Sequence, residues 1–277
     1  MPYASNRHDG VRTYFEDWGG GGSPILVYSG LADPIAASRR TGLVQALRGD
    51  YRLIFADHRG HGRSDKPHEV IAYALPTRAD DAVAVLDELG IHRAHMLGFS
   101  WGARLGFALG EYAADRLRSL VLCGNQPYAW EARWPFVPTL TEALEVAATT
   151  GMQGFLDALE RSFGDSIGEP DRSWTLENDA LAIGAAWRSA LAEGVVSSDL
   201  RHWTLPCLIY MAEGESMYDN AARAATEIPN ARLLTLPGHS HLSAPAAVDQ
   251  VLPAVRELLA EADALGDADV AADADQR

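Results

Sequence analysis

In the stretch Gly98-Phe99-Ser100-Trp101-Gly102, a serine stands two residues from a glycine on either side. A predicted strand, residues 94–97, precedes it, and a predicted helix, residues 101–114, follows. A G-x-S-x-G sequence in this context is typical of a nucleophile elbow, a tight turn that raises a serine hydroxyl above the carboxyl end of a strand. The helix N-terminus behind the turn favours developing negative charge. We therefore predict that Ser100 is a catalytic nucleophile; the alternative is a glycine-rich turn with an incidental serine.

Short β-rich runs alternate with helical stretches on both sides of this motif. The predicted strands cover residues 11–16, 25–28, 52–56, 94–97, 120–123, 207–211 and 232–236, and the predicted helices cover residues 33–48, 77–89, 101–114 and 247–262. Asp33 and Pro34 are interpreted as the N-cap and first residue of one helix, and Thr77 with Asp80 as the start of the next. The alternation indicates an α/β fold with a mostly parallel sheet flanked by helices.

One section, residues 127–203, breaks the alternation because it contains no strong strand. Two long helical stretches are predicted there, residues 140–163 and 176–191, together with five of the seven tryptophans of the chain. We interpret this section as a helical insertion over the sheet rather than an independent domain. The chain then divides into a first core segment (1–126), the insertion (127–203), a second core segment (204–262) and a tail (263–277).

Composition and charge disfavour several classes of function. The formal net charge of −15 argues against nucleic acid and anionic membranes as partners, because both require clustered Lys and Arg. No apolar run approaches the roughly 20 residues of a transmembrane helix, and the first residues do not resemble a secretory signal. Cys123 and Cys207 each lie in an apolar run, so we expect buried free thiols and a cytoplasmic location. The acidic tail, residues 263–277, is expected to be disordered.

Three further motifs, taken with the serine turn, resemble the α/β-hydrolase superfamily over residues 10–260. Tyr28-Ser29-Gly30-Leu31 resembles the family's His-Gly-x turn after the third strand. Residues 57–67, Asp-His-Arg-Gly-His-Gly-Arg-Ser-Asp-Lys-Pro, resemble its D-x-R-G-x-G-x-S loop, and the last motif is a histidine-bearing loop after the final strand. The resemblance is closer to the small esterase, lactonase and peroxidase-like members than to lipases. It implies an α/β-hydrolase fold in which residues 127–203 form the cap.

A serine hydroxyl is a weak nucleophile that needs a base, and the base needs an acidic group to orient it. The order of serine, acid and histidine in the family implies an acid just after the predicted strand at residues 207–211. Many relatives carry Gly-Glu-x-Asp there, and a gapless comparison places Glu215 at the aspartate position. Glu213 and Asp219 are the alternatives.

The base is expected in the loop that follows the last predicted strand, residues 237–242. Relatives often have Pro-Gly-x-x-His there, which favours His241, and His239 is the alternative because many relatives also carry Gly-His. The two histidines are not expected to bind a metal, because no further clustered ligands accompany them. The resemblance implies no metal and no organic cofactor.

An acyl-transfer site also needs two N–H donors for the oxyanion of its tetrahedral intermediate. The resemblance implies the backbone N–H groups of Trp101 and Leu31. Asp33 could contact substrate, but helix capping already explains it. The remaining candidates for the substrate pocket are Ser29, Gly30, Trp130, Trp134 and Trp187, although the three tryptophans are equally consistent with the core of the cap itself.

The sequence thus predicts a serine hydrolase that acts on a carboxylic ester, lactone or thioester of a small molecule with an apolar acyl part. The same triad would also support acyl transfer, cyclisation, carbon–carbon cleavage or perhydrolase side activity, because fold does not settle chemistry. A non-catalytic protein that binds a small ligand is the third possibility. No feature of the sequence points to a particular oligomeric state.

Overall fold

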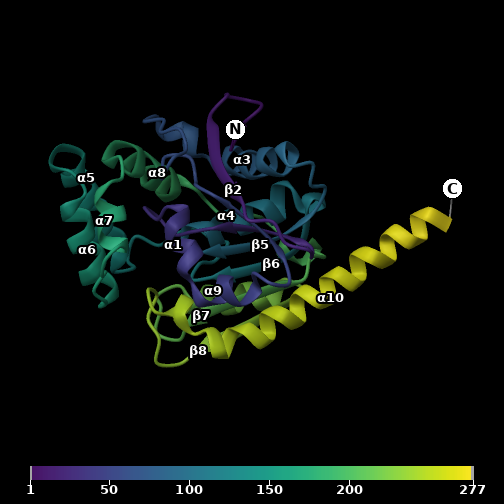
Figure 1. Cartoon of the computed structure of the whole chain (residues 1–277). Helices are drawn as coiled ribbons and strands as arrows, with labels where there is room; N and C mark the ends of the chain where they lie inside the picture. The colour runs from purple at the N-terminus through teal and green to yellow at the C-terminus, as the bar shows by residue number, and fades with distance from the viewer. Residues whose placement is uncertain (1, 276–277) are drawn as a thin grey trace.

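Eight strands form a single sheet in the order β1-β2-β4-β3-β5-β6-β7-β8 (Figure 1). The structure is a computed structural model that describes the backbone of residues 2–275 and their side chains, except those of residues 163 and 266–275. The strands are β1 (Tyr3–Ser5), β2 (Arg12–Asp17), β3 (Pro24–Tyr28), β4 (Arg52–Ala56), β5 (Ala94–Phe99), β6 (Leu117–Cys123), β7 (Cys207–Ala212) and β8 (Ala231–Leu236). Strands β3 to β8 are parallel and β1 and β2 are antiparallel, which confirms the predicted mostly parallel sheet.

The central strands are buried on both faces, because helices cover the sheet on each side. One layer contains α3 (Leu75–Glu88), α4 (Trp101–Tyr112) and α9 (Tyr218–Glu227), and the other contains α1 (Ile35–Arg40), α2 (Gly42–Leu47) and α10 (Val248–Asp275). This burial explains why β3 and β7 are continuous apolar runs rather than alternating ones. Short 3₁₀ turns lie between these elements at Val70–Tyr73, Ala114–Arg116, Leu200–His202 and Ala244–Ala246.

The predicted helix at residues 33–48 is two short helices, α1 and α2, which meet at Thr41. The N-cap assigned to Asp33 is wrong: Pro34 occupies the cap position, and the side chain of Asp57 accepts the N–H of Ile35 at 2.7 Å. The next helix begins at Leu75, without a side-chain cap from Thr77. In the first case a carboxylate distant in sequence displaces the local one, which a pattern of neighbouring residues does not reveal.

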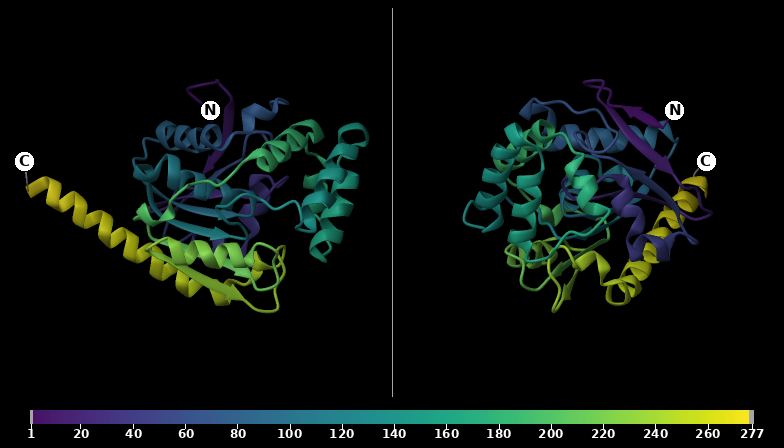
Figure 2. Two further views of the ribbon diagram at one scale, coloured as in Figure 1. Left: turned by 180° about the vertical axis from the view of Figure 1, so that it is seen from behind. Right: turned by 60° about the vertical axis from the view of Figure 1, so that its left-hand side comes forward.

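The cap consists of four helices rather than the two predicted: α5 (Phe136–Thr150), α6 (Gln153–Phe163), α7 (Asp171–Leu176) and α8 (Ala180–Ala192). Gly151, with φ of 86°, ends α5, and the side chain of Asp179 caps a new helix at α8 by accepting two backbone N–H groups. Figure 2 shows these helices stacked at one edge of the sheet, where the carboxyl ends of the parallel strands lie. The ends of the cap meet, because the N–H of Val196 donates to the carbonyl of Pro127 at 2.7 Å.

Helix α10 continues to Asp275 and projects from the body of the protein (Figure 1), where we expected a disordered tail from residue 263. Asp263 accepts hydrogen bonds from Ser23 and His95, so packing of this helix extends past the predicted boundary. The side chains of residues 266–277 lie outside the described part of the chain.

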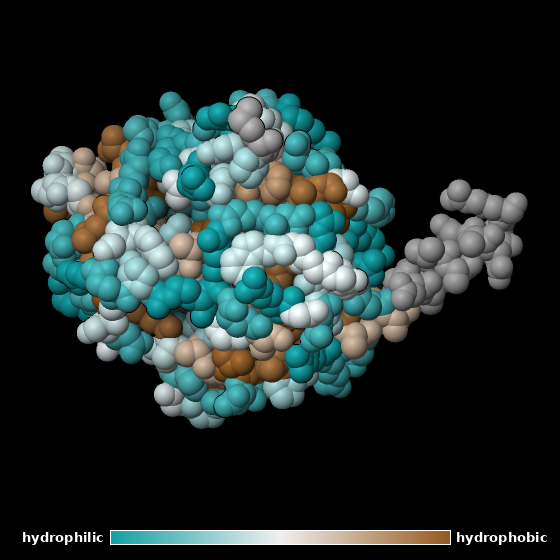
Figure 3. Space-filling view, viewed as in Figure 1, coloured by the Kyte–Doolittle hydropathy of each residue, from teal (hydrophilic) through white to brown (hydrophobic). Residues whose placement is uncertain are grey.

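The surface in Figure 3 is mostly hydrophilic, which agrees with the composition, and the two cysteines are buried, as we expected from the apolar runs around them. Hydrophilic residues predominate on the face shown in Figure 3, and hydrophobic ones form small separate patches. Among the described residues, no helix has the length and apolar character needed to cross a membrane. Cys123 and Cys207 are both buried and free, as predicted, and burial raises the pKa of each thiol.

Candidate active site

Ser100 lies at the turn between β5 and α4 in a conformation that non-glycine residues rarely adopt. Its φ is 51° and its ψ is −107°. Two neighbours hold it there: its N–H donates to the carbonyl of Cys123 at 2.7 Å, and the Asn125 side-chain amide donates to the Ser100 carbonyl at 3.0 Å. Backbone strain of this kind persists only where the surroundings enforce it, and it concentrates at functional sites. The turn has the geometry of a nucleophile elbow.

The glycines of the motif are required by close backbone contacts. A β-carbon on Gly98 would lie 2.4 Å from the carbonyl oxygen of Gly102, and one on Gly102 would lie 2.3 Å from the carbonyl oxygen of Tyr28. Real β-carbons do not approach other atoms so closely, so any larger residue would displace the turn. The spacing of the motif is thus dictated by packing of the first turn of α4 against the ends of β3 and β5.

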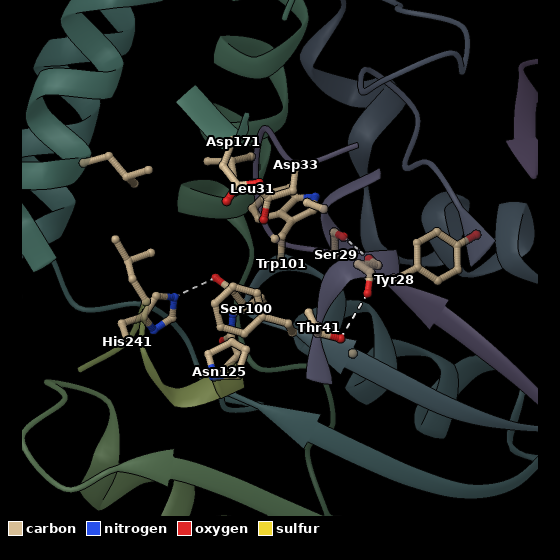
Figure 4. A pocket seen from close by; sticks show the side chains of 18 of the residues that line it. Tyr28, Ser29, Leu31, Asp33, Thr41, Ser100, Trp101, Asn125, Asp171 and His241 are labelled. Carbon is tan, nitrogen blue, oxygen red and sulfur yellow. Dashed lines mark hydrogen bonds between the residues drawn. The ribbon is translucent and has the colours of Figure 1, made fainter. Parts of the chain in front are cut away.

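Three predicted catalytic side chains form one hydrogen-bonded series. His241 Nε2 lies 2.9 Å from Ser100 Oγ, and His241 Nδ1 lies 2.6 Å from Glu215 Oε2. The side chains of His241 and Glu215 are only 4% and 8% exposed. Glu215 comes from the turn after β7, His241 from the loop after β8, and Ser100 from the turn after β5, so strand ends carry all three. Figure 4 shows the side chains of His241 and Ser100 directed toward each other.

The alternative candidates for acid and base point elsewhere. His239 is near the surface and contacts the Gln250 side chain at 3.1 Å. Glu213 and Asp219 are exposed, before and after the turn that carries Glu215. The structure therefore brings Glu215 and His241 to Ser100 and leaves the other three residues outside the site.

The turn after β3 presents the other half of the site. Among the described residues, no backbone or side-chain acceptor takes the N–H of Leu31 or of Trp101. Both residues line the same cavity as Ser100. Ala32 follows Leu31 with φ of 66°, and the N–H of Gly102 donates to the Ser29 carbonyl at 2.9 Å, which ties this turn to α4. The two free N–H groups are the donors that an oxyanion would require.

The Asp57–Pro67 loop supports that turn from behind rather than reaching the cavity. The carboxylate of Asp57 accepts the N–H of Ile35 at 2.7 Å and that of Arg63 at 2.8 Å. His58 Nε2 lies 3.1 Å from the Ser29 carbonyl, and burial lowers the pKa of His58 well below its usual range, so it is a neutral donor. The loop motif is therefore structural: it holds α1 and the Ser29 carbonyl in place.

A cavity of about 470 Å³ opens above Ser100 (Figure 4). The cap supplies an apolar part of the cavity wall through Trp130, Phe136, Leu140, Leu159 and Trp187. The rings of Trp130 and Trp187 lie 5.1 Å apart. Ser29 and Gly30 also line the cavity. Trp134 does not line it but stacks on Phe136, as a residue of the cap's own core.

A buried arginine of α4 fixes both ends of the cap to the helix that follows the nucleophile. Arg104 is 1% exposed and donates to the carbonyls of Gln126 and Tyr128, at 2.8 and 2.7 Å, and of Gly194, at 3.0 Å. The first two carbonyls precede the cap helices and the third follows them. Glu193 lies 3.7 Å from the same guanidinium group. No signal in the sequence distinguishes this arginine from others.

Sequence reasoning treated substrate contact as the weaker of two interpretations of Asp33 and did not identify Asp171 at all. Asp33, assigned to a helix cap, and Asp171, from α7, both line the cavity. Burial first, and the charge of Asp171 second, raise the pKa of Asp33 to about 7. Asn178 joins the cap to the oxyanion turn by donating to the carbonyl of Ala32 at 2.7 Å. Within the described residues, no three His, Cys, Asp or Glu side chains gather as metal ligands would.

Known proteins resemble this chain over most of its length. The sequence profile described as "alpha/beta hydrolase fold" matches residues 19–244. A non-heme haloperoxidase of Rhodococcus erythropolis is 29% identical over 264 residues, covering 87% of this chain and 93% of that protein. The 3-oxoadipate enol-lactonase 1 of Acinetobacter baylyi is 29% identical over 170 residues, covering 60% of this chain and 62% of the lactonase.

Solved structures agree with the fold. The crystal structure of an enol-lactonase from Burkholderia xenovorans superposes with a TM-score of 0.78 at 24% identity, covering 94% of this chain and 100% of that chain. A thermophilic esterase from Thermogutta terrifontis superposes with a TM-score of 0.77 at 21% identity, covering 94% of this chain and 98% of the other. At these identities the superpositions establish the fold alone.

Proposed function

The chain belongs to the α/β-hydrolase fold family, and on that premise we propose that it is a serine hydrolase acting on a carboxylic ester, lactone or thioester. The observation that carries the proposal is the series Glu215–His241–Ser100, with contacts of 2.6 and 2.9 Å, at the base of a cavity with an apolar wall. A hydrogen-bonded series that ends on a strained serine favours catalysis over non-catalytic ligand binding.

In the proposed mechanism, Ser100 Oγ attacks the carbonyl carbon of the substrate while His241 Nε2 accepts the hydroxyl proton. The carboxylate of Glu215 orients the ring through Nδ1 and stabilises the imidazolium that forms. The carbonyl oxygen becomes an oxyanion and takes the N–H groups of Leu31 and Trp101. His241 then donates its proton to the departing alcohol or thiol, and an acyl group remains on Ser100.

Hydrolysis of the acyl-enzyme repeats these steps with water as the nucleophile. His241 accepts a proton from water, the second oxyanion forms in the same place, and the proton returns to Ser100 Oγ as the acid leaves. The cap shields the acyl group with apolar side chains such as Trp130 and Trp187, which suits a substrate with an apolar acyl part. The likeness to an enol-lactonase makes lactones and enol esters the first substrates to test.

Steady-state kinetics on a p-nitrophenyl ester series test the proposal with matched pairs of variants. Ser100→Ala and His241→Ala are each expected to lower kcat by about 10⁴-fold or more, because members of such a triad act as a unit. His239→Ala is the control for the base, since this histidine is two residues away and contacts only Gln250 among the described side chains. Glu213→Ala is the corresponding control for the acid. Full activity of Ser100→Ala, or equal losses in His239→Ala and His241→Ala, would contradict the proposal.

Product analysis separates hydrolysis from the other reactions that this triad supports. Turnover in water containing competing alcohols or amines is expected to give the free acid as the main product. A dominant ester or amide product would instead identify acyl transfer as the activity.

A further inference from the structure

The Asp33 side chain lines the cavity, although it caps no helix and takes no part in the series Glu215–His241–Ser100. The chain turns back at residues 30–33, where the N–H of Asp33 lies 3.3 Å from the Gly30 carbonyl. This turn directs the Asp33 carboxyl toward the cavity instead of the start of α1. Its Oδ2 lies 2.8 Å from the point that a β-carbon on Gly30 would occupy, and Phe99 Cε1 lies 3.3 Å from the same point. The carboxyl is therefore next to the residue that precedes the Leu31 donor.

Within the described residues, the Asp33 carboxyl forms no ion pair, and the charge of His241 is the smallest of the influences on its pKa. Among the described side chains, no Lys, Arg or His lies within ion-pair distance of it, and the polar group that faces it is the backbone N–H of Gly30. A carboxylate in such surroundings is unfavourable unless a counter-charge or a proton reaches it. Burial accordingly raises the pKa of Asp33 to about 7. At neutral pH the group is thus poised to ionise when a cation arrives.

A second carboxylate reinforces the negative character of this side of the cavity. Asp171 of α7 interacts with Asp33 through its charge, and Figure 4 shows both side chains on the same side of Ser100. Apart from His241, the one cationic side chain that lines the described cavity is that of Arg40, an exposed residue whose guanidinium lies 3.6 Å from Asp171. That contact leaves Asp33 uncompensated. The aromatic rings of Trp130 and Trp187 also line the cavity, and the face of such a ring attracts a cation.

We propose that Asp33 is the anchor of a cation subsite, and that the preferred substrates are esters or lactones whose acyl part carries a protonated amine a few bonds from the scissile carbonyl. The inference rests on the proposed function, because Ser100 and the Leu31 donor fix where the carbonyl lies. With the carbonyl oxygen at Leu31, a nearby ammonium group reaches the carboxylate two residues further along the chain. The ammonium would provide the counter-charge that the protein lacks, and Asp171 would add a weaker attraction.

A pair of esters that differ in one amino group tests the subsite. Methyl 3-amino-4-phenylbutanoate and methyl 4-phenylbutanoate share the same chain and ring, and an aliphatic amine remains protonated up to about pH 8. The readout is the ratio of kcat/KM for the two esters, measured from acid release. We expect wild type to prefer the amino ester by about 10- to 100-fold, as for a hydrogen bond to a charged group. Asp33→Asn is expected to reduce the ratio to about one.

Glu177→Gln provides a matched control for loss of one negative charge. Glu177 ends α7, is exposed and does not line the cavity. This variant is expected to keep the wild-type ratio, because solvent screens an exposed charge. A ratio near one in wild type, or a preference that survives in Asp33→Asn, would overturn the cation subsite. A preference lost equally in Glu177→Gln would show that overall charge, and not Asp33, selects the amine.

The pH dependence of the same kcat/KM ratio tests the subsite on the wild-type protein alone, so the test does not depend on whether a variant folds. Three charged groups surround the Asp33 carboxyl: Asp171 from α7, His241 from the loop after β8, and Arg40 beyond Asp171. Because Asp33 ionises near pH 7, the ratio in wild type is expected to rise as the pH increases through about 7. A ratio that is flat from about pH 6 to about pH 8 would overturn the proposal.

Fluorophosphonate labelling of Ser100 keeps the two proposals separable. A wild-type protein that is labelled but shows no preference for the amino ester, including one that cleaves neither ester, would overturn the cation subsite and leave the serine mechanism intact. A folded wild-type protein that is not labelled and cleaves no ester would overturn the proposed function itself.

Discussion

Replacing Glu215 by glutamine removes one charge from the catalytic series while keeping nearly the same shape. The carboxylate lies 2.6 Å from His241 Nδ1 and is 8% exposed, so little solvent screens it. During the attack of Ser100, His241 becomes an imidazolium, and the two charge centres are then about 4 Å apart. At an effective dielectric constant of about 20, that attraction is about 4 kcal/mol. Its loss is expected to lower kcat by about 10³-fold, with little change in KM.

The assay is the steady-state hydrolysis of one p-nitrophenyl ester by wild type, Glu215→Gln and Glu213→Gln at the same pH. Glu213 precedes the catalytic turn and is exposed, so Glu213→Gln is expected to retain wild-type kcat. Glu215→Asp keeps the charge but withdraws it by about 1.5 Å, the length of one carbon–carbon bond, and should show an intermediate loss. A loss of less than about tenfold in Glu215→Gln, or an equal loss in Glu213→Gln, would refute the assignment of the acid.

Four further changes test the packing and electrostatics of the site. Gly102→Ala is expected to lower Tm and abolish turnover, because the new β-carbon would lie 2.3 Å from the Tyr28 carbonyl oxygen. The control is Gly154→Ala in the cap, where the nearest atom to a new β-carbon is 3.9 Å away, and this variant should keep the wild-type Tm and turnover. Arg104→Met should lower the free energy of unfolding in urea by about 3 kcal/mol, because it removes three hydrogen bonds between α4 and the two ends of the cap and leaves Glu193 with Arg78, at 3.9 Å, as its remaining ion-pair partner among the described residues. An unchanged midpoint would argue against this role of Arg104. Trp187→Ala should shift the preferred acyl chain of the ester series to longer substrates, since it enlarges the apolar wall; an unchanged optimum would place the acyl group elsewhere. Asp33→Asn should stabilise the protein by up to about 4 kcal/mol at pH 8 but not at pH 4. The reason is that the pKa of Asp33 is about 7 in the folded state and about 3.9 in the unfolded state, so the wild-type protein loses stability as the pH rises from about 4 to about 7. Equal stabilisation at both pH values would contradict the raised pKa.

The hydrogen-bonded series of Ser100, His241 and Glu215 was predictable from sequence because each member lies in a short segment tied to the end of a strand. Ser100 is identified by glycines that packing requires at fixed spacing, and Glu215 and His241 follow their strands by a fixed number of residues. A gapless reading therefore places all three. The parallel sheet was predictable for a similar reason, since doubly covered strands are apolar throughout.

The features that the sequence did not reveal depend on contacts between distant segments. Whether Asp33 or Asp57 caps α1 is decided by the loop after β4, which supplies Asp57 to the N–H of Ile35 from 22 residues away. The same contact frees Asp33 to face the cavity. Likewise, Arg104 is one of many arginines until folding brings the two ends of the cap to it. Local propensity predicted that residues 127–203 are helical but not where the helices end. Gly151 ends α5, and the side chain of Asp179 caps the start of α8.

Labelling by a fluorophosphonate, followed by mass spectrometry of the digested protein, tests most directly that Ser100 is the nucleophile. The expected result is a single adduct on the peptide that contains Ser100, formed by wild type and by His239→Ala but not by Ser100→Ala, and formed far more slowly by His241→Ala. An adduct on another residue, or no adduct on a folded wild-type protein, would contradict the account.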